Sequence, residues 1–123
     1  MLNNGLADAL ATLVAGTAIP VKLTAGITRR PSAAIESIAY FCAAELLANA
    51  VKHSGAGRIT VEAAQRDSVL LLTVSDDGAG GADPQGSGLA GLAQRIRTVD
   101  GHLEISSPPG GPTRIRADLP LRA

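Results

Sequence analysis

Glycines are concentrated in one short stretch of this 123-residue chain. The sequence contains 14 glycines, and six of them fall within the 14 positions of residues 78–91. This stretch follows residues 69–74, the most apolar run of the chain, and leads into a segment whose apolar residues have helical spacing. Because glycine lacks a Cβ, it permits left-handed backbone and a close approach of the backbone to another group. The fold must therefore place a glycine-rich loop between a buried strand and the start of a helix.

Periodicity and turn residues predict three helices and five strands around this loop. Helices are predicted over residues 2–14, 31–54 and 88–99, with proline, serine or glycine near their boundaries. Strands are predicted over residues 20–23, 58–64, 69–75, 102–106 and 113–119. Polar or glycine-rich turns at residues 65–68 and 108–112 join the second strand to the third and the fourth to the fifth.

The order of these elements favours a two-layer α/β sandwich. Strand pairs joined by short turns imply antiparallel pairing, so we expect a mixed, mainly antiparallel sheet covered on one face by three helices. The nearly unbroken apolar run of residues 69–74 predicts a central strand covered on both faces. The length suits one domain and no linker divides the chain, so we expect a single domain over residues 1–123.

Composition argues against several classes of protein. The chain has 11 basic and 11 acidic residues and only 2% aromatic residues, which disfavours nucleic-acid binding. Its single cysteine, Cys42, excludes an internal disulfide and a cysteine metal cluster, and a reducing compartment is natural. No uninterrupted apolar run reaches the roughly 18 residues of a membrane helix, and the N-terminus lacks the basic lead of a signal peptide. We expect a cytoplasmic domain with no membrane contact, which leaves open whether it belongs to a membrane-bound protein.

Four polar residues share one face of the otherwise apolar second helix. At the helical rotation of each residue, Glu45, Asn49, Lys52 and His53 fall within an arc of about 100°. A carboxylate, a carboxamide, an ammonium and an imidazole can together hold a hydrated divalent cation and contact a polyphosphate. The same pattern also fits a helix that buries one face and solvates the other, so both interpretations remain open at this point.

The glycine-rich loop begins with a carboxylate at the end of the buried strand. Asp76 can accept a hydrogen bond from a ligand's amino group, and Gly78 and Gly80 leave room for a flat ring to approach the backbone. The alternative is a tight Asp-Gly turn. A two-residue turn, however, requires neither three glycines within residues 78–81 nor the further loop residues that follow.

The end of the loop has the literal spacing of a dinucleotide-binding fingerprint at residues 86–91. The context contradicts that interpretation, because the fingerprint does not directly follow a strand and only 32 residues remain after Gly91. Glycines at a helix N-terminus nevertheless expose N–H groups, and the helix dipole favours an anion there. We interpret Gly86, Gly88 and Leu89 as contacts for a triphosphate.

The order of these motifs resembles the ATP-binding domain shared by sensor histidine kinases, type II topoisomerases, Hsp90 and MutL, known as the Bergerat-type ATPase fold. The chain is most similar to the NarX/DesK-like group of two-component kinases. The segments that support this group are residues 20–23, 39–40, 45–54, 101–105 and 119–121. Three departures are Pro112 before Thr113, Asp77 where asparagine is frequent, and a loop without a phenylalanine box.

The resemblance implies a role for each of these positions in binding Mg²⁺·ATP. Asn49 would ligate Mg²⁺, and Glu45 would act on or through a water as a base or an orienting group. Asp76 would accept a hydrogen bond from the adenine amino group, with support from Thr113. The other implied contacts are Lys52 and His53 with the phosphates, Gly78 and Gly80 around the adenine, and Gly86, Gly88 and Leu89 over the triphosphate. Residues 79–87 would form a mobile lid.

The resemblance also implies a function, which is transfer of the γ-phosphoryl group of ATP to a histidine on a separate dimerisation domain. A response regulator would be an indirect partner. The chain's own histidines are His53, inside the nucleotide motif, and His102, so we expect the phosphoacceptor histidine to lie elsewhere. We also expect the isolated chain to be a monomer. The alternatives are a serine kinase of the anti-sigma-factor type and a non-catalytic nucleotide-binding or interaction module. Residues 52–54 and 119–121 favour the histidine kinase over the first, and the intact Glu45, Asn49 and Asp76 argue against the second.

Overall fold

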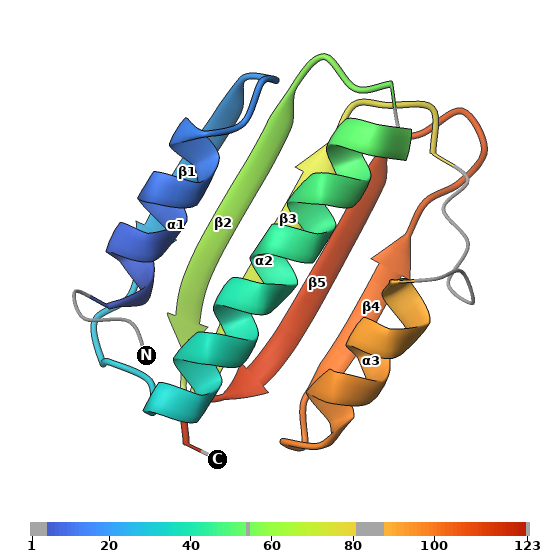
Figure 1. Cartoon of the computed structure of the whole chain (residues 1–123). Helices are drawn as coiled ribbons and strands as arrows, with labels where there is room; N and C mark the ends of the chain where they lie inside the picture. Colours follow the sequence, from blue (N-terminus) through green and yellow to red (C-terminus); the bar gives the residue numbers. More distant parts are fainter. Residues whose placement is uncertain (1–4, 54, 81–87, 123) are drawn as a thin grey trace.

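The computed structural model describes residues 5–53, 55–80 and 88–122, and in this part the chain forms three helices and five strands (Figure 1). In chain order the elements are α1 (Leu6–Ala15), β1 (Val21–Gly26), α2 (Ala33–His53), β2 (Ile59–Arg66), β3 (Val69–Asp76), α3 (Leu89–Arg97), β4 (His102–Ser106) and β5 (Thr113–Pro120). The predicted order of elements is confirmed. Residues 2–4, which were expected to start the first helix, lie outside the described residues.

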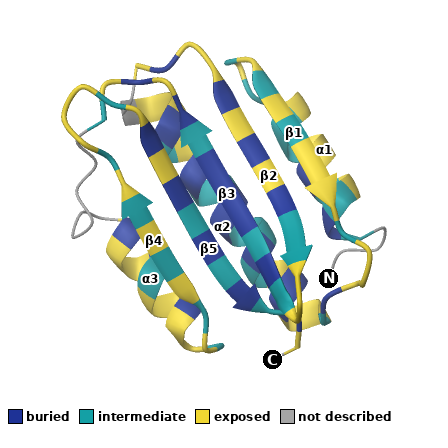
Figure 2. Ribbon diagram, turned by 180° about the vertical axis from the view of Figure 1, so that it is seen from behind, coloured by how far each residue is buried: buried dark blue, intermediate teal, exposed yellow. Residues whose placement is uncertain are grey.

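The five strands form one mixed sheet in the order β1-β2-β3-β5-β4. Strands β1 and β2 pair in parallel, with α2 as the crossover between them, and the other neighbours pair antiparallel. All three helices lie on one face of the sheet (Figure 1), and the view from behind shows the other face without a helix (Figure 2). The expected two-layer α/β sandwich is therefore confirmed.

The hydrophobic core lies between the helices and the covered face of the sheet. Strand β2 shows the alternation that this arrangement requires, because Ile59 and Val61 are buried whereas Thr60 and Glu62 are exposed. The largest helical contribution comes from the buried residues of α2, which are Ile35, Ala39, Cys42, Ala43, Leu46, Leu47 and Ala50. Because these residues follow one another at helical spacing, α2 lies along the sheet and contacts β2, β3 and β5.

By length and hydropathy alone, one helix within the described residues is able to cross a membrane. It is the segment Ala33–Lys52 of α2, with a mean hydropathy of 1.4 although Glu36 and Glu45 interrupt the apolar run. The core helix of a globular domain meets the same criterion. Since the buried side of α2 packs on the sheet, we interpret it as such a core helix.

The structure differs from the prediction for β3, because one face of the sheet carries no helix. Leu70 and Leu72 point toward the helices and are fully buried, whereas Leu71, between them, lies on the open face and is half-buried. In the sheet register Leu71 is flanked by Ala64 of β2 and Asp118 of β5. The prediction that this strand is covered on both faces is wrong. Neighbouring strands on both sides partly shield its outer side chains, so apolar residues are accommodated there without a second layer.

A buried carboxylate anchors the start of α1 to α2. Gly5, the residue before α1, offers no side-chain cap, and the Leu6 N–H instead donates to Glu36 Oε2 at 3.2 Å. Arg30 donates from its guanidinium to both oxygens of the same carboxylate, each at 3.2 Å from Nε. Glu36 is only 1% exposed. It therefore supplies the acceptor that the first turn of α1 lacks locally, and the guanidinium compensates its charge.

Replacing Glu36 by alanine should lower the free energy of unfolding by about 2 kcal/mol, because a buried charged acceptor of two donors is removed. Urea unfolding followed by circular dichroism measures this loss. The Glu36→Gln variant keeps one acceptor oxygen and should lose less. As a matched control, Glu62→Ala at an exposed position of β2 should change the free energy by less than about 0.5 kcal/mol. Equal losses in the two alanine variants would contradict the anchoring role.

Candidate functional site

Two of the predicted site residues on α2 face the start of α3. A Cβ built on Gly88, the residue before α3, would lie 3.7 Å from Asn49 Nδ2 and 4.0 Å from Glu45 Oε2. Gly88 has a φ of 94°, which favours glycine, and it offers no side-chain cap to the helix. The first N–H groups of α3 are therefore near a carboxylate and a carboxamide, and Leu89 follows directly as a buried residue.

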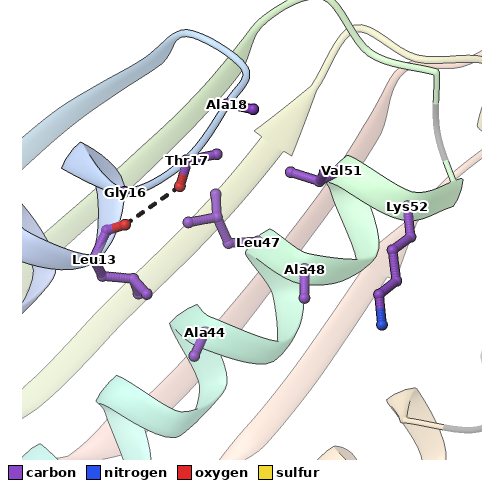
Figure 3. A pocket seen from close by; sticks show the side chains of 9 residues that line it. All are labelled: Leu13, Gly16, Thr17, Ala18, Ala44, Leu47, Ala48, Val51 and Lys52. Carbon is purple, nitrogen blue, oxygen red and sulfur yellow. Dashed lines mark hydrogen bonds between the residues drawn. The ribbon is translucent and has the colours of Figure 1, made fainter.

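The remaining predicted phosphate contacts are only partly within the described structure. Lys52 is exposed near the end of α2, where it is one of the residues that line a groove beside α1 (Figure 3). His53 is the last residue of α2, but its side chain lies outside the described residues. Gly86 and most of the predicted lid, residues 81–87, also lie outside them. Their roles stay predictions.

Asp76 ends β3 as a buried carboxylate next to the glycine loop. It is 6% exposed, and its Oδ1 accepts a hydrogen bond from the Gly78 N–H at 2.8 Å. Since each carboxylate oxygen can accept more than one hydrogen bond, Asp76 keeps acceptor capacity for a further donor. Its Cα partner on β5 is Thr113, which is also buried and whose hydroxyl lies 2.6 Å from the Ser107 hydroxyl. Thr113 thus lies beside Asp76 through strand pairing.

Two glycines allow the loop after β3 to pack directly on the turn between β4 and β5. A Cβ built on Gly80 would lie 2.0 Å from the Pro108 carbonyl oxygen, and one on Gly111 would lie 1.9 Å from the Gly78 carbonyl oxygen. Both glycines have positive φ angles, 70° and 79°. Because Gly80 has no side chain, the turn between β4 and β5 is able to approach its backbone closely. Sequence reasoning did not identify this role of Gly111, although the run of residues 110–112 signals an unusual turn.

Helix α3 is also attached to α2 beside the candidate site. The Arg95 guanidinium lies 4.1 Å from the centre of the Phe41 ring, a cation–π contact one turn before Glu45 on α2. The adjacent Cys42 is fully buried, and this burial raises the pKa of its thiol to about 12, with Arg95 opposing the shift. The thiol is therefore neutral at physiological pH, which agrees with the expectation that Cys42 and Phe41 serve packing.

A separate groove lies on the other side of α2, next to α1. It has a volume of about 320 Å³, and apolar side chains such as Leu13, Leu47 and Val51 line it (Figure 3). One wall is the end of α1, where the Thr17 hydroxyl donates to the Leu13 carbonyl oxygen. Of the predicted site residues, Lys52 lines this groove, whereas Glu45 and Asn49 face α3, so the groove is not the place where the carboxylate and the carboxamide meet.

The oxygen donors at the candidate site suit a hard cation that keeps part of its water shell. Among the described residues, no group of three or more His, Cys, Asp or Glu side chains is placed to hold a metal ion. The space in front of Gly88 instead has one carboxylate and one carboxamide, from Glu45 and Asn49. Mg²⁺ is commonly held by one or two protein groups together with waters and substrate phosphates. The donor set therefore fits Mg²⁺ bound jointly by protein and nucleotide.

Comparison with known families identifies the class of protein that this fold and site define. Residues 35–123 match the family described as histidine kinase-, DNA gyrase B- and HSP90-like ATPase. The chain belongs to this family, which implies that it binds ATP. The resemblance noted from the sequence motifs is thereby confirmed.

The more specific relatives are sensor kinases. The chain is 41% identical over 81 residues to the signal transduction histidine-protein kinase/phosphatase UhpB of Salmonella typhimurium, a match that covers 63% of this chain and 16% of the relative. It is 34% identical to the sensor histidine kinase NarS of Mycobacterium tuberculosis, over 96% of this chain and 30% of the relative. The chain therefore spans less than a third of the length of these relatives.

Solved structures support the fold. The histidine kinase domain of the blue-light activated histidine kinase EL346 from Erythrobacter litoralis superposes with a TM-score of 0.71 at 20% identity, covering 94% of this chain and 57% of that chain. The histidine kinase AdeS of Acinetobacter baumannii gives a TM-score of 0.69 at 17% identity, with coverages of 94% and 61%. At these identities the similarity establishes the α/β sandwich and nothing finer.

The contact between the two loops predicts a large effect of a small side chain. Gly111→Ala should lower the free energy of unfolding by about 2 kcal/mol or more, because the Cβ would overlap the Gly78 carbonyl oxygen at a positive φ. Urea unfolding measures the loss. The matched control is Gly91→Ala on α3, where a Cβ meets open space and alanine should stabilise the helix slightly. A Gly111→Ala protein as stable as the Gly91→Ala protein would refute the packing role.

Proposed function

We propose that this chain is the catalytic, ATP-binding domain of a two-component sensor histidine kinase. It binds Mg²⁺·ATP and presents the γ-phosphoryl group to a histidine on a separate dimerisation domain, from which a response regulator is phosphorylated. The observation that carries the proposal is the convergence of Glu45 and Asn49 on Gly88, with the buried Asp76 at the end of the central strand β3. The 34% identity to NarS over 96% of the chain supports the kinase class.

In this proposal the adenine end of the nucleotide lies at β3. Asp76 accepts a hydrogen bond from the adenine amino group while its Oδ1 also accepts from the Gly78 N–H, which holds the carboxylate in place. Thr113 lies beside Asp76 across the sheet and supports it. Gly78 and Gly80 shape the backbone around the ring. The selectivity for adenine then depends on a buried acceptor, which penalises a base that offers no donor there.

The phosphate end lies between α2 and α3. Asn49 is the protein ligand of Mg²⁺, and Lys52 and His53 face the phosphates. The metal neutralises phosphate charge when bound. Gly86, Gly88 and Leu89 close over the triphosphate, where the N-terminus of α3 favours an anion. Glu45 orients the attacking group, directly or through a water, and accepts its proton.

Catalysis of this kind is mainly positioning and neutralisation of charge. The chain supplies the nucleotide half of the reaction and the dimerisation domain supplies the nucleophile, so the isolated domain binds nucleotide with little turnover. As a single domain over residues 1–123 it acts as a monomer in the cytoplasm, with neither nucleic acid nor membrane as a partner. The other domains of the whole sensor protein determine whether it is attached to a membrane.

The adenine assignment predicts that Asp76→Asn weakens ATP binding at least about tenfold, because a buried charged acceptor is replaced by a partly donating amide. Isothermal titration calorimetry with ATP and Mg²⁺ measures the affinity, and circular dichroism checks that the fold is retained. Asp67→Asn, in the turn between β2 and β3, is the matched control and should bind as the unchanged chain does. Equal ATP affinity in both variants would eliminate the adenine assignment.

Phosphotransfer tests the proposed acceptor. Incubated with radiolabelled ATP and a histidine-bearing dimerisation domain of a NarS-like kinase, the chain should produce an acid-labile, base-stable phosphoprotein. Asn49→Asp should reduce this transfer more than it reduces ATP binding, since Asn49 acts through Mg²⁺. Label on a serine of an anti-sigma-type substrate alone would favour that class of kinase. ATP binding without transfer to either acceptor would indicate a non-catalytic nucleotide-binding module.

A further inference from the structure

Asp77 binds a different part of the chain from its neighbour Asp76. Its Oδ1 accepts hydrogen bonds from the N–H groups of Gly57, at 2.9 Å, and Arg58, at 3.1 Å. Its own N–H donates to the Arg58 carbonyl oxygen at 3.3 Å. Three hydrogen bonds therefore join the residue after β3 to the connection that leads from α2 to β2.

The two glycines of this connection, Gly55 and Gly57, contribute no side-chain packing of their own. A Cβ built on Gly55 or on Gly57 would meet nothing within 4 Å, so these two residues lie in open surroundings. Gly55 has a φ of 65°, which makes a sharp change of direction possible directly after the helix region. Ala56, between the two glycines, is buried. The Asp77 carboxylate is thus a polar attachment for the path of the chain from α2 into β2.

The hydrogen bonds of Asp77 join two segments of the chain, and each segment carries one end of the candidate site. On one side is the end of α2, with Lys52 near its last turn; on the other side is Asp76 at the end of β3. We infer that Asp77 is a positioning residue that holds the phosphate-binding end of α2 at a set distance from the adenine-binding carboxylate. The inference rests on the proposed function. Asp77 itself contacts backbone and acts on the nucleotide only through these elements.

Substitutions of Asp77 separate the effect of its hydrogen-bond acceptor from the effect of its charge. One oxygen of Asp77 accepts both N–H groups, and an asparagine carbonyl oxygen is able to do the same. Alanine offers no acceptor. Because Asp77, Gly57 and Arg58 are all exposed, water replaces the lost hydrogen bonds in the alanine variant, and the fold should persist.

The test compares binding of ATP and of adenosine by the whole chain, measured by calorimetry for ATP and by ligand-observed NMR for adenosine. Asp77→Ala should weaken ATP binding about fivefold to tenfold, the effect of losing roughly 1 kcal/mol of positioning. Adenosine, which uses only the Asp76 end, should bind within about twofold of the unchanged chain. Asp77→Asn should behave as the unchanged chain does, and Asp8→Ala, an exposed aspartate on α1, serves as the control.

Each other outcome overturns the inference. Unchanged ATP affinity in Asp77→Ala would show that the attachment does not position the site. Equal losses for ATP and adenosine would assign Asp77 a general structural role, and a loss in Asp77→Asn as large as in Asp77→Ala would make charge the cause. If the alanine variant does not fold, Asp77→Ser, whose side chain is one atom shorter, gives the same comparison. An unchanged chain that fails to bind ATP would overturn the proposed function itself, together with this inference.

Discussion

The packing of α2 against the sheet is the constraint on which the candidate site depends. The helix buries an apolar side against β2, β3 and β5, and this contact fixes its rotation about its own axis. Because side chains on a helix leave the axis at fixed angles, the same contact directs Glu45 and Asn49 toward the start of α3. A rotation of α2 by one residue would move both away from Gly88 and place polar groups in the core. Stability and site geometry therefore depend on one interface.

Most of the fold could be predicted from local patterns in the sequence. Helical and strand periodicity, with glycine and proline at the boundaries, predicted every element in order, and the observed bounds differ by a few residues at most of the described ends. The expectation that failed concerned β3, because an apolar run does not reveal how much cover its outer face needs. Leu71 is tolerated on the open face through its neighbours in the sheet, Ala64 and Asp118, which only the strand register brings beside it.

The candidate site was predictable where its residues belong to short motifs and unpredictable where they act across the chain. The order of Asn49, Asp76 and Gly88 along the sequence predicted an ATP-binding domain, which the family match confirms, and the role of each residue stays a prediction. The attachments that hold these motifs in place were not predictable, since they join residues distant in sequence: Glu36 to Leu6, 30 positions apart, and Asp77 to Gly57, 20 positions apart. Such hydrogen bonds follow from the folded topology rather than from residue spacing.

Because the Gly80 and Gly111 backbones are in direct contact, the loop after β3 and the turn between β4 and β5 are mechanically coupled. With no side chain between them, neither segment has space to slide toward the other, so a displacement of the chain after β3 is transmitted to the turn between β4 and β5. An insertion in that turn, or a change in its curvature, would alter the surroundings of Asp76 without touching it. Evolution of the turn is thereby restricted to exposed outer positions that do not take part in the contact, such as Pro109.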